Sequence, residues 1–285
     1  MSRLALDELS LTQRTVRSAN VHVRATARRV AWALLPDRYP QPVAASADAY
    51  PHLWAAACRQ VRRSDPDVDP RLEAGKLHNL QLAAPAFDGL ELSPTRPLSF
   101  WRTLGAATAE RGFVSGMELR GGCVVPAIGG GLCLLSNALF EVAARAGCEI
   151  LERWGHTREA APPDPALPFG LDATVFFPHV DLRFRPEEAP LLLRTRVDAE
   201  RLVTELWGAT PPGRSVVLEG HDDGVDRGMR TGRLWRDVTF ADGSTVRELL
   251  AEDRREVMTS TERRRNCMTC GLTACPSRVE ARLAP

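Results

Sequence analysis

One cysteine of the sequence lies where local structure would make its thiol reactive. Cys133 follows three glycines, Gly129, Gly130 and Gly131, which allow a backbone to approach a ligand closely or to adopt positive φ angles. From Ser136 onward the apolar residues have helical spacing. Cys133 is therefore predicted at or just before a helix N-terminus, which favours the thiolate, the form of cysteine that acts as nucleophile and as metal ligand.

A histidine and an aspartate further along the chain could serve this thiol. His156 is a candidate general base and Asp172 a candidate to orient it, in the chain order of thiol enzymes of the papain and transglutaminase kind. Such a site would support acyl transfer or amide hydrolysis, with backbone amides near Cys133 as oxyanion donors. The alternative is structural: a packed cysteine, a loop histidine and an aspartate that caps a turn or strand.

A second cluster predicts a metal site near the C-terminus. Cys267, Cys270 and Cys275 lie within nine positions, and closely spaced thiolates can converge on one metal. They could hold a 4Fe-4S cluster with one open iron, or recruit Cys133 or Cys123 as a fourth ligand for iron-sulfur or zinc. A basic tail with incidental thiols and no metal is the alternative.

The composition limits the possible partners. The 285 residues contain 37 Lys and Arg against 36 Asp and Glu, so global charge predicts no nucleic acid or anionic membrane partner. No apolar stretch is long enough to span a bilayer, and the N-terminus lacks the pattern of a secretory signal. We expect a cytoplasmic protein. The substrate and the oligomeric state are not readable from the sequence.

Periodicity predicts helices first and strands later. We expect one amphipathic helix from Leu9 to Leu35 and a short helix over Leu53 to Arg62. Leu80 to Leu82 and Leu90 to Leu92 have the pattern of short strands around a turn at Asp88-Gly89. Further strands are predicted over residues 149–153, 173–177, 181–185, 191–197, 202–207, 215–219 and 234–240.

This order of elements predicts an α+β fold. We expect an N-terminal helical region over residues 1–75, a core over 76–207 and a β-rich region with a cysteine-rich tail over 208–285. Residues 161–168 form a proline-rich loop in this prediction, and Gly220 to Gly228 form an acidic loop without calcium-ligand spacing.

Several segments, taken in order, resemble the VanW family. They are Lys76-Leu77-His78-Asn79-Leu80-Gln81-Leu82-Ala83-Ala84, Leu98-Ser99-Phe100-Trp101, Gly129-Gly130-Gly131-Leu132-Cys133-Leu134-Leu135-Ser136-Asn137, Glu152-Arg153-Trp154-Gly155-His156, Gly170-Leu171-Asp172-Ala173-Thr174-Val175 and Asp181-Leu182-Arg183. The resemblance covers roughly Lys76 to Arg196. It implies an association with antibiotic resistance or biosynthesis. The family usually has Gln after the motif cysteine, where this chain has Leu134.

The matched segments add ligand-binding candidates to the site. These are Asn79 as a polar wall, the glycines Gly129, Gly130 and Gly131, and Ser136. Trp101 is expected to pack in the core with its indole N–H bonded to a partner. Cys58 and Cys148 are expected to be buried small side chains.

These observations favour an enzyme with a cysteine-centred site and a C-terminal iron-sulfur or zinc site. Its substrate would be a small molecule or a precursor of peptidoglycan or a natural product. Two alternatives remain open. One is a thiol acyltransferase or amidohydrolase without metal, and the other is a non-catalytic accessory protein that binds a ligand and carries a structural metal.

Overall fold

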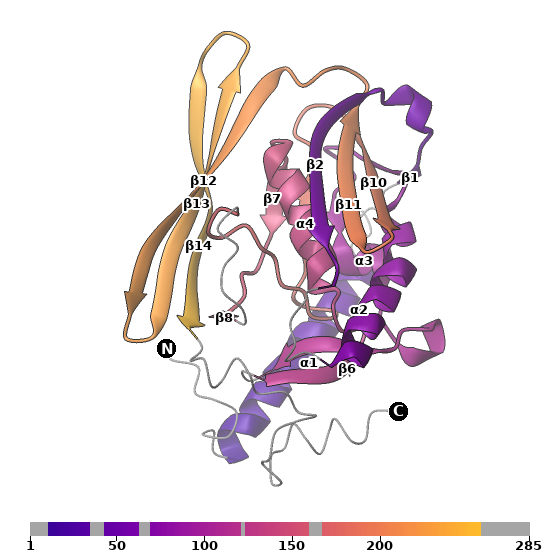
Figure 1. Cartoon of the computed structure of the whole chain (residues 1–285), viewed down its shortest axis with the longest axis vertical. Coiled ribbons are helices and arrows are strands. Elements are labelled where there is room, and N and C mark those ends of the chain that lie inside the picture. Colours follow the sequence, from indigo (N-terminus) through magenta and orange to yellow (C-terminus); the bar gives the residue numbers. More distant parts are fainter. Residues whose placement is uncertain (1–10, 35–42, 63–68, 121–122, 160–166, 258–285) are drawn as a thin grey trace.

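A computed structural model describes residues 11–34, 43–62, 69–120, 123–159 and 167–257. Helices and mostly antiparallel sheets both contribute, so the predicted α+β class is confirmed for these residues (Figure 1). The α-helices are α1 (Leu11–Leu34), α2 (Pro70–Ala83), α3 (Phe100–Leu104) and α4 (Cys133–Arg145). The strands are β1 (Val43–Ala44), β2 (His52–Gln60), β3 (Leu90–Leu92), β4 (Leu98–Ser99), β5 (Ser115–Arg120), β6 (Cys123–Ile128), β7 (Glu149–Glu152), β8 (Arg158–Glu159), β9 (Arg183–Arg185), β10 (Leu191–Asp198), β11 (Arg201–Gly208), β12 (Arg214–Asp226), β13 (Met229–Phe240) and β14 (Thr245–Val257).

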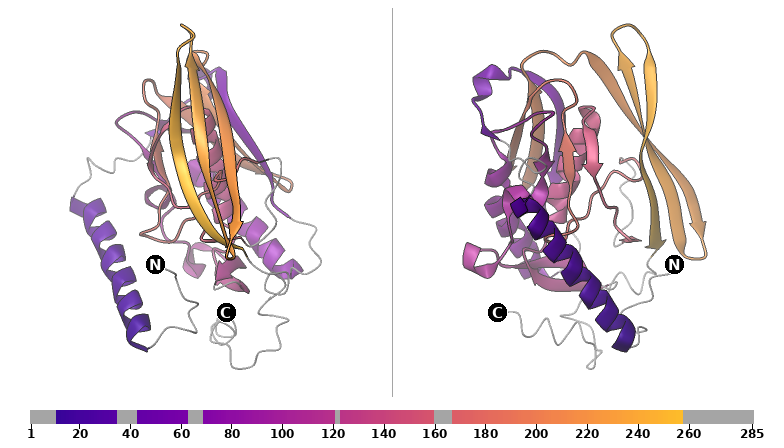
Figure 2. Two further views of the ribbon diagram at one scale, coloured as in Figure 1. Left: turned by 90° about the vertical axis from the view of Figure 1, so that its left-hand side faces the viewer. Right: turned by 180° about the vertical axis from the view of Figure 1, so that it is seen from behind.

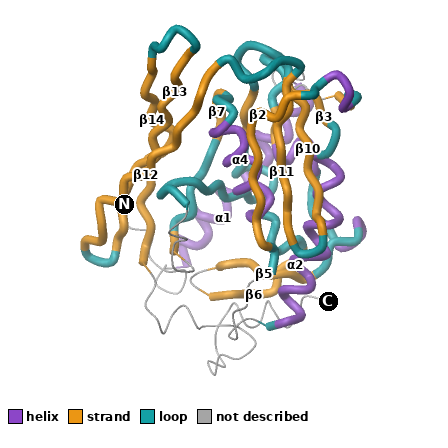
Figure 3. The backbone as a smooth tube through the Cα atoms, turned by 45° about the horizontal axis from the view of Figure 1, so that its top comes forward, coloured by secondary structure: helices purple, strands orange, loops and turns teal. Residues whose placement is uncertain are grey.

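A five-stranded sheet with the order β1-β3-β10-β11-β2 lies on one side of the fold, and α4 lies between it and the C-terminal strands (Figure 3). Helix α4 packs against β2 and β11, and α2 packs against β10. On α4, Leu135, Leu139 and Val142 are fully buried, at the spacing that places apolar side chains on one helix face. Core packing therefore fixes the helix whose first residue is Cys133.

Strand β2 shows that the helix predicted over Leu53 to Arg62 is wrong. Ala55 and Ala57 are buried while Ala56 and Cys58 are exposed, and the strand pairs with β11 along its length. Alanine has the highest helix propensity of any residue, but propensity is a weak preference that pairing with a neighbouring strand overrides. Cys58 is consequently exposed and not buried as predicted. The pairing also joins residues from the region 1–75 to the same sheet as β10 and β11.

Helix α2 replaces the strand predicted over Leu80 to Leu82. Asp69 caps its first turn by accepting a hydrogen bond of 2.8 Å from the amide of Arg71, and Pro70 stands at the first helical position. These start signals lie about ten residues before the apolar pair that had suggested a strand, so the local alternation was misleading. The following turn at Asp88-Gly89 and the strand β3 agree with the prediction.

The C-terminal strands β12, β13 and β14 form a long sheet beside the rest of the fold (Figure 2). The loop predicted over Gly220 to Gly228 is wrong, because β12 continues to Asp226 and only Arg227 and Gly228 turn the chain into β13. Arg236 fastens the sheet to the helix end, since its buried Nη1 donates to the carbonyl of Cys148 at 2.7 Å. Its Nη2 donates to Glu248 at 2.6 Å.

The strand predicted over Ala173 to Phe177 is a loop in the structure. Residues 171–180 form only one isolated bridge, between Phe176 and Val180, and β9 begins at Arg183. The loop bonds to side chains of α4 in place of a strand partner. The alternating apolar pattern therefore predicted an extended segment correctly, but this segment bonds to side chains of α4 and not to another strand.

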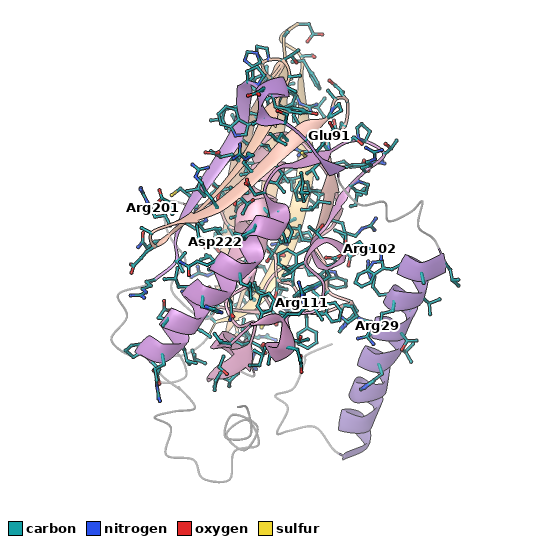
Figure 4. All side chains as sticks on the ribbon, turned by 90° about the vertical axis from the view of Figure 1, so that its right-hand side faces the viewer. Arg29, Glu91, Arg102, Arg111, Arg201 and Asp222 are labelled. Carbon is teal, nitrogen blue, oxygen red and sulfur yellow. The ribbon has the colours of Figure 1, made fainter. Side chains whose placement is uncertain are left out.

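Helix α1 agrees with the prediction over Leu11–Leu34. Its arginine Arg28 bonds Glu152 at 2.7 and 2.9 Å. Arg29, labelled in Figure 4, lies with its guanidinium carbon 5.7 Å from the ring centre of Phe177. In the part of the chain that the structure describes, neither α1 nor any other helix has the length and apolar character needed to cross a membrane.

Candidate functional site

Cys133 is the first residue of α4 and follows a glycine turn. Gly129 and Gly131 have φ values of +75° and +99°, which side-chain-bearing residues rarely adopt. A β-carbon on Gly131 would lie 2.2 Å from Cγ of Lys76, so the turn also has no room for a side chain. The predicted position of Cys133 at a helix N-terminus is confirmed.

Asn79 holds the glycine turn in place through side-chain hydrogen bonds. Its side-chain amide donates to the carbonyls of Val114 at 2.9 Å and Gly130 at 3.0 Å, and its oxygen accepts from the amide of Val114 at 2.9 Å. The side chain is fully buried. Both N–H groups are thus engaged with the backbone, and a contact between Asn79 and a ligand stays a prediction.

Two polar residues of α4 hold the loop 171–175 against the thiol. Ser136 donates its hydroxyl to the carbonyl of Ala173 at 2.6 Å, and Asn137 accepts from the amide of Ala173 at 2.8 Å. The next residues then reach Cys133, whose sulfur lies 3.7 Å from Oγ1 of Thr174 and 3.9 Å from the carbonyl oxygen of Val175. Ser136 therefore positions the wall of the site, while its predicted contact with a ligand remains untested.

His156 connects the thiol to a carboxylate. Its Nδ1 lies 2.5 Å from Oδ2 of Asp172, and its backbone amide donates to the same oxygen at 3.1 Å. The His156 side chain also forms a hydrogen bond with the side chain of Cys133. The structure therefore brings the three candidate catalytic residues together, with the imidazole between thiol and carboxylate.

Two arginines and a second aspartate hold Asp172 in place. Arg153 donates to Oδ1 of Asp172 at 3.1 Å, and Arg255 on β14 donates to the same oxygen. Asp253 bonds both arginines, Arg153 at 2.5 and 2.7 Å and Arg255 at 2.9 Å. Both oxygens of Asp172 thus have donors, which fixes the carboxylate that faces His156.

The electrostatics favour a charged pair of thiolate and imidazolium. Burial raises the pKa of the Cys133 thiol, but the hydrogen bond and charge of His156 outweigh it and hold that pKa below its ordinary value. Burial opposes the charged form of His156 as well, yet Asp172 and Cys133 raise the pKa of His156 far above its ordinary value. The pKa of Asp172 is held well below its usual range by His156, Arg255 and Arg153, against the effect of burial.

The helix N-terminus offers donors to an anion beside the sulfur. Among the residues described, the backbone amides of Leu132 and Cys133 donate to no backbone carbonyl, as expected for the first turn of an α-helix. These N–H groups carry the positive end of the helix dipole. They are the nearest candidates for stabilising negative charge on an oxygen attached to a carbon that Cys133 attacks.

Sequence patterns did not predict the ion pairs that Arg153, Arg255 and Asp253 form around Asp172, which we call the clamp. Arg153 lies in the segment Glu152-Arg153-Trp154-Gly155-His156, directly after β7, and arginines are usually solvated. Asp253 and Arg255 lie about eighty residues after Asp172, on a strand that no sequence pattern had predicted. Asp253 and Arg255 come close to Asp172 only because the folded chain places β14 beside the site.

The remaining cysteines fall into different classes. Cys148 is buried as predicted, and burial raises the pKa of its thiol to about 12. Cys267, Cys270 and Cys275 lie outside the described residues, so the metal site stays a prediction, as does a role for Cys133 or Cys123 as its fourth ligand. Within the described ranges, no three His, Cys, Asp or Glu side chains gather to hold a metal ion.

Ser99, which precedes α3, and Trp101, in its first turn, support the fold. Ser99 donates to Asp181 at 2.5 Å, and the indole N–H of Trp101 donates to the carbonyl of Val180 at 2.9 Å. Burial raises the pKa of Asp181 to about 6. Trp101 packs edge-on against Phe100 with ring centres 4.8 Å apart, so the expected core role of Trp101 is confirmed.

Comparison with known proteins assigns the central part of the chain. Residues 75–207 match the family model described as "VanW like protein", which includes Cys133, His156 and Asp172 but ends before β12. An uncharacterized protein of Bacillus subtilis (strain 168), YoaR, is 32% identical over 133 residues, covering 46% of this chain and 43% of YoaR.

A second similar protein is the vancomycin B-type resistance protein VanW of Enterococcus faecalis (strain ATCC 700802 / V583). It is 29% identical over 142 residues, covering 49% of this chain and 52% of that protein. The chain thus spans about half the length of the curated relatives it matches. No solved structure matches the chain.

Proposed function

The chain belongs to the VanW family through residues 75–207, and on this premise we propose that it is a thiol enzyme of acyl transfer or amide hydrolysis. The observation that carries the proposal is the hydrogen-bonded series of Cys133, His156 and Asp172, in which the imidazole bonds the carboxylate through Nδ1 and also bonds the thiol. Nucleophile, base and orienting group in this arrangement are the requirements of covalent acyl catalysis.

The reaction would begin with the charged pair. The Cys133 thiolate attacks the carbonyl carbon of an amide or ester, and the carbonyl electron pair moves onto oxygen. The amides of Leu132 and Cys133 would stabilise that oxyanion. As the carbonyl re-forms, the bond to the leaving amine or alcohol breaks and the imidazolium of His156 protonates the leaving group. The product of this half-reaction is a thioester on Cys133.

The second half-reaction would release the acyl group. Neutral His156 takes a proton from water or from an acceptor amine, which attacks the thioester and regenerates the thiolate and the imidazolium. Asp172 keeps Nδ1 protonated, so the other ring nitrogen always faces the sulfur. Arg153 and Arg255 keep Asp172 ionised and oriented through this cycle.

The resistance role in the name of the Enterococcus protein belongs to that protein. For this chain it makes amides of peptidoglycan precursors the first natural substrates to assay, before amides of natural-product precursors. The position after the nucleophile, Leu134, is occupied here by an apolar side chain, so this proposal assigns oxyanion binding to backbone groups and not to a side-chain amide.

The test uses p-nitrophenyl acetate as acyl donor and intact-protein mass spectrometry. We expect the wild-type protein to release p-nitrophenolate and to gain one acetyl group on Cys133. His156→Gln should lower the acetylation rate by about a hundredfold or more. Cys58→Ser, which removes an exposed free cysteine, is the matched control and should leave the rate unchanged.

Two results would contradict the proposal. One is acetylation of wild-type protein at Cys58 without modification of Cys133. The other is an equal acetylation rate in wild-type protein and in folded His156→Gln. If Cys133→Ser binds peptidoglycan precursors as the wild type does and neither protein turns them or the ester over, the accessory-protein alternative is favoured.

A further inference from the structure

Helix α1 contacts the rest of the fold along one of its faces. Arg28 donates to the carboxylate of Glu152 at 2.7 and 2.9 Å, and the ring centre of Trp32 lies 6.3 Å from that of Phe177. Residues four apart lie on the same side of a helix, so Arg28 and Trp32 define the inner face of α1. Figures 2 and 4 show α1 at the outside of the molecule. The opposite face of α1 is therefore turned toward solvent.

This outward face of α1 carries a row of apolar side chains. Val23, Val30 and Leu34 have 66%, 48% and 72% of their surface accessible, and Ala27 between them is exposed as well. Spacings of four, three and four residues place these side chains in one row about 16 Å long, which we call the outer stripe. An amphipathic helix of a folded domain usually turns such a row toward the core. The outer stripe points away from the core, as expected for a surface that contacts a partner.

Helix α1 is also strongly cationic. Residues 11–34 include five arginines and no Asp or Glu, although the charges of the whole chain nearly balance. Arg28 is neutralised by Glu152. Arg24 and Arg29 are exposed, and no ion pair among the described residues includes either of them. Their positive charge is therefore available to an anionic partner.

Arg24 and Arg29 lie on the two flanks of the outer stripe. Successive residues of an α-helix are about 100° apart, so Arg24 lies to one side of Val23 and Arg29 lies to the other side of Val30. The contact of Arg29 with the ring of Phe177 leaves its charge in place. A flat anionic surface can contact the stripe and both cations at once, because long arginine side chains reach from the flanks of a helix to the plane of its apolar face.

We infer that α1 binds the surface of an anionic lipid membrane, with the outer stripe against the acyl chains and with Arg24 and Arg29 at the headgroup phosphates. Helices that lie in the membrane interface combine an apolar face with basic residues in this way. Each basic side chain near the surface adds attraction to anionic lipid. The inference goes beyond the proposed acyl chemistry and does not depend on it, because membrane binding involves neither Cys133 nor His156.

The test measures sedimentation of the full chain with lipid vesicles. One set of vesicles contains equal amounts of phosphatidylglycerol, which is anionic, and phosphatidylcholine, which carries no net charge. The other set contains phosphatidylcholine alone. We expect saturable binding to the anionic vesicles that weakens as salt is added, and binding to phosphatidylcholine alone that is weaker by about tenfold or more.

Val30→Glu tests the outer stripe. It places a carboxylate in the row, while glutamate has a helix propensity at least as high as that of valine. Binding to the anionic vesicles should fall by about tenfold or more. Val217→Glu is the matched control, because Val217 is also exposed, at 60%, lies on β12 and undergoes the same change of charge. The control should bind as the wild type does.

Arg24→Gln tests the charge of the flank without altering the outer stripe. Loss of one cation near an anionic surface should weaken binding about fivefold. Arg254→Gln removes an exposed arginine of β14 and is its matched control, with no change of binding expected. Thermal unfolding checks that each variant is folded.

Three results would each overturn the inference: no binding to the anionic vesicles, equal binding to the two sets of vesicles, or equal weakening by Val30→Glu and Val217→Glu. Sedimentation velocity covers the alternative occupant. Self-association that Val30→Glu abolishes, in a protein that binds no vesicles, would assign the outer stripe to a second copy of the chain and would overturn the inference as well.

Discussion

Replacement of Arg255 by glutamine tests whether the C-terminal sheet positions the site. Arg255 lies on β14, outside residues 75–207, and donates to both Asp172 and Asp253. Its side chain is only 15% exposed, so water screens these ion pairs little. The variant leaves Asp172 with Arg153 and His156 as its remaining side-chain partners.

The expected cost follows from the lost bonds. A hydrogen bond to a charged group contributes about 1.5 to 3 kcal/mol, and a loss of this size lowers the melting temperature of a chain of this size class by roughly 3 to 10 °C. The less restrained Asp172 orients His156 less well, so the rate of Cys133 acetylation by p-nitrophenyl acetate should fall about tenfold, equivalent to about 1.4 kcal/mol. Arg255→Lys keeps the charge and should recover part of both losses.

The neighbouring Arg254→Gln is the matched control, because Arg254 is exposed on the same strand. It should change neither the melting temperature nor the acetylation rate. Thermal unfolding by circular dichroism and stopped-flow release of p-nitrophenolate supply the two measurements. If Arg255→Gln behaves like Arg254→Gln in both, β14 does not hold Asp172 in the way proposed.

Three further predictions concern pH, the glycine turn and the cysteine tail. The lowered pKa of Cys133 makes wild-type stability rise with pH, and the raised pKa of His156 makes it fall with pH, so the two effects oppose each other. In Cys133→Ser only the effect of His156 remains; it is complete below about pH 6.5 and declines as pH rises, so urea titrations should show stability falling more steeply with pH in this variant than in the wild type. Asn79→Ala should cost roughly 3 kcal/mol by leaving the N–H of Val114 and the carbonyl of Gly130 without a partner, and an unchanged urea midpoint would argue against this role of Asn79. Protein purified without oxygen should contain iron with sulfide, or zinc, that is lost when Cys267, Cys270 and Cys275 become serine; wild-type protein without either metal would count against that site.

The sequence carried more information about elements than about their pairing. The α4 helix and the strands β10 and β11 were readable because their apolar periodicity matches their burial. Residues 53–62 and 80–82 were assigned to the wrong class, because short alanine-rich or leucine-containing stretches satisfy both periods. Pairing with β11 makes residues 53–60 a strand, and the cap at Asp69 begins the helix that contains residues 80–82. The length of β12 and the existence of β14 depend on hairpin pairing with β13, and their mostly exposed residues give little apolar alternation to read.

The local features of the candidate site could likewise be predicted from the sequence, whereas its long-range contacts could not. The glycine turn before Cys133 predicted a helix N-terminus from local conformation alone, and residue chemistry suggested His156 and Asp172 as its partners. The arrangement of the clamp could not follow from spacing, because Arg153 reaches Asp172 from the loop after β7 and Arg255 reaches it from β14. Asn79 was singled out by its segment, and its bonds to Val114 and Gly130 depend on a turn that only the fold creates.

The central claim is that His156 activates the Cys133 thiol, and its most direct test is the pH dependence of alkylation. Wild-type protein and His156→Gln would be treated with iodoacetamide from pH 5 to 9, with modification of each cysteine followed by mass spectrometry. Cys58, exposed and free on β2, serves as the internal reference. We predict that Cys133 in the wild type reacts at lower pH than Cys58 and loses this advantage in His156→Gln. A Cys133 profile that follows Cys58 in the wild type, or that is unchanged in folded His156→Gln, would contradict the account.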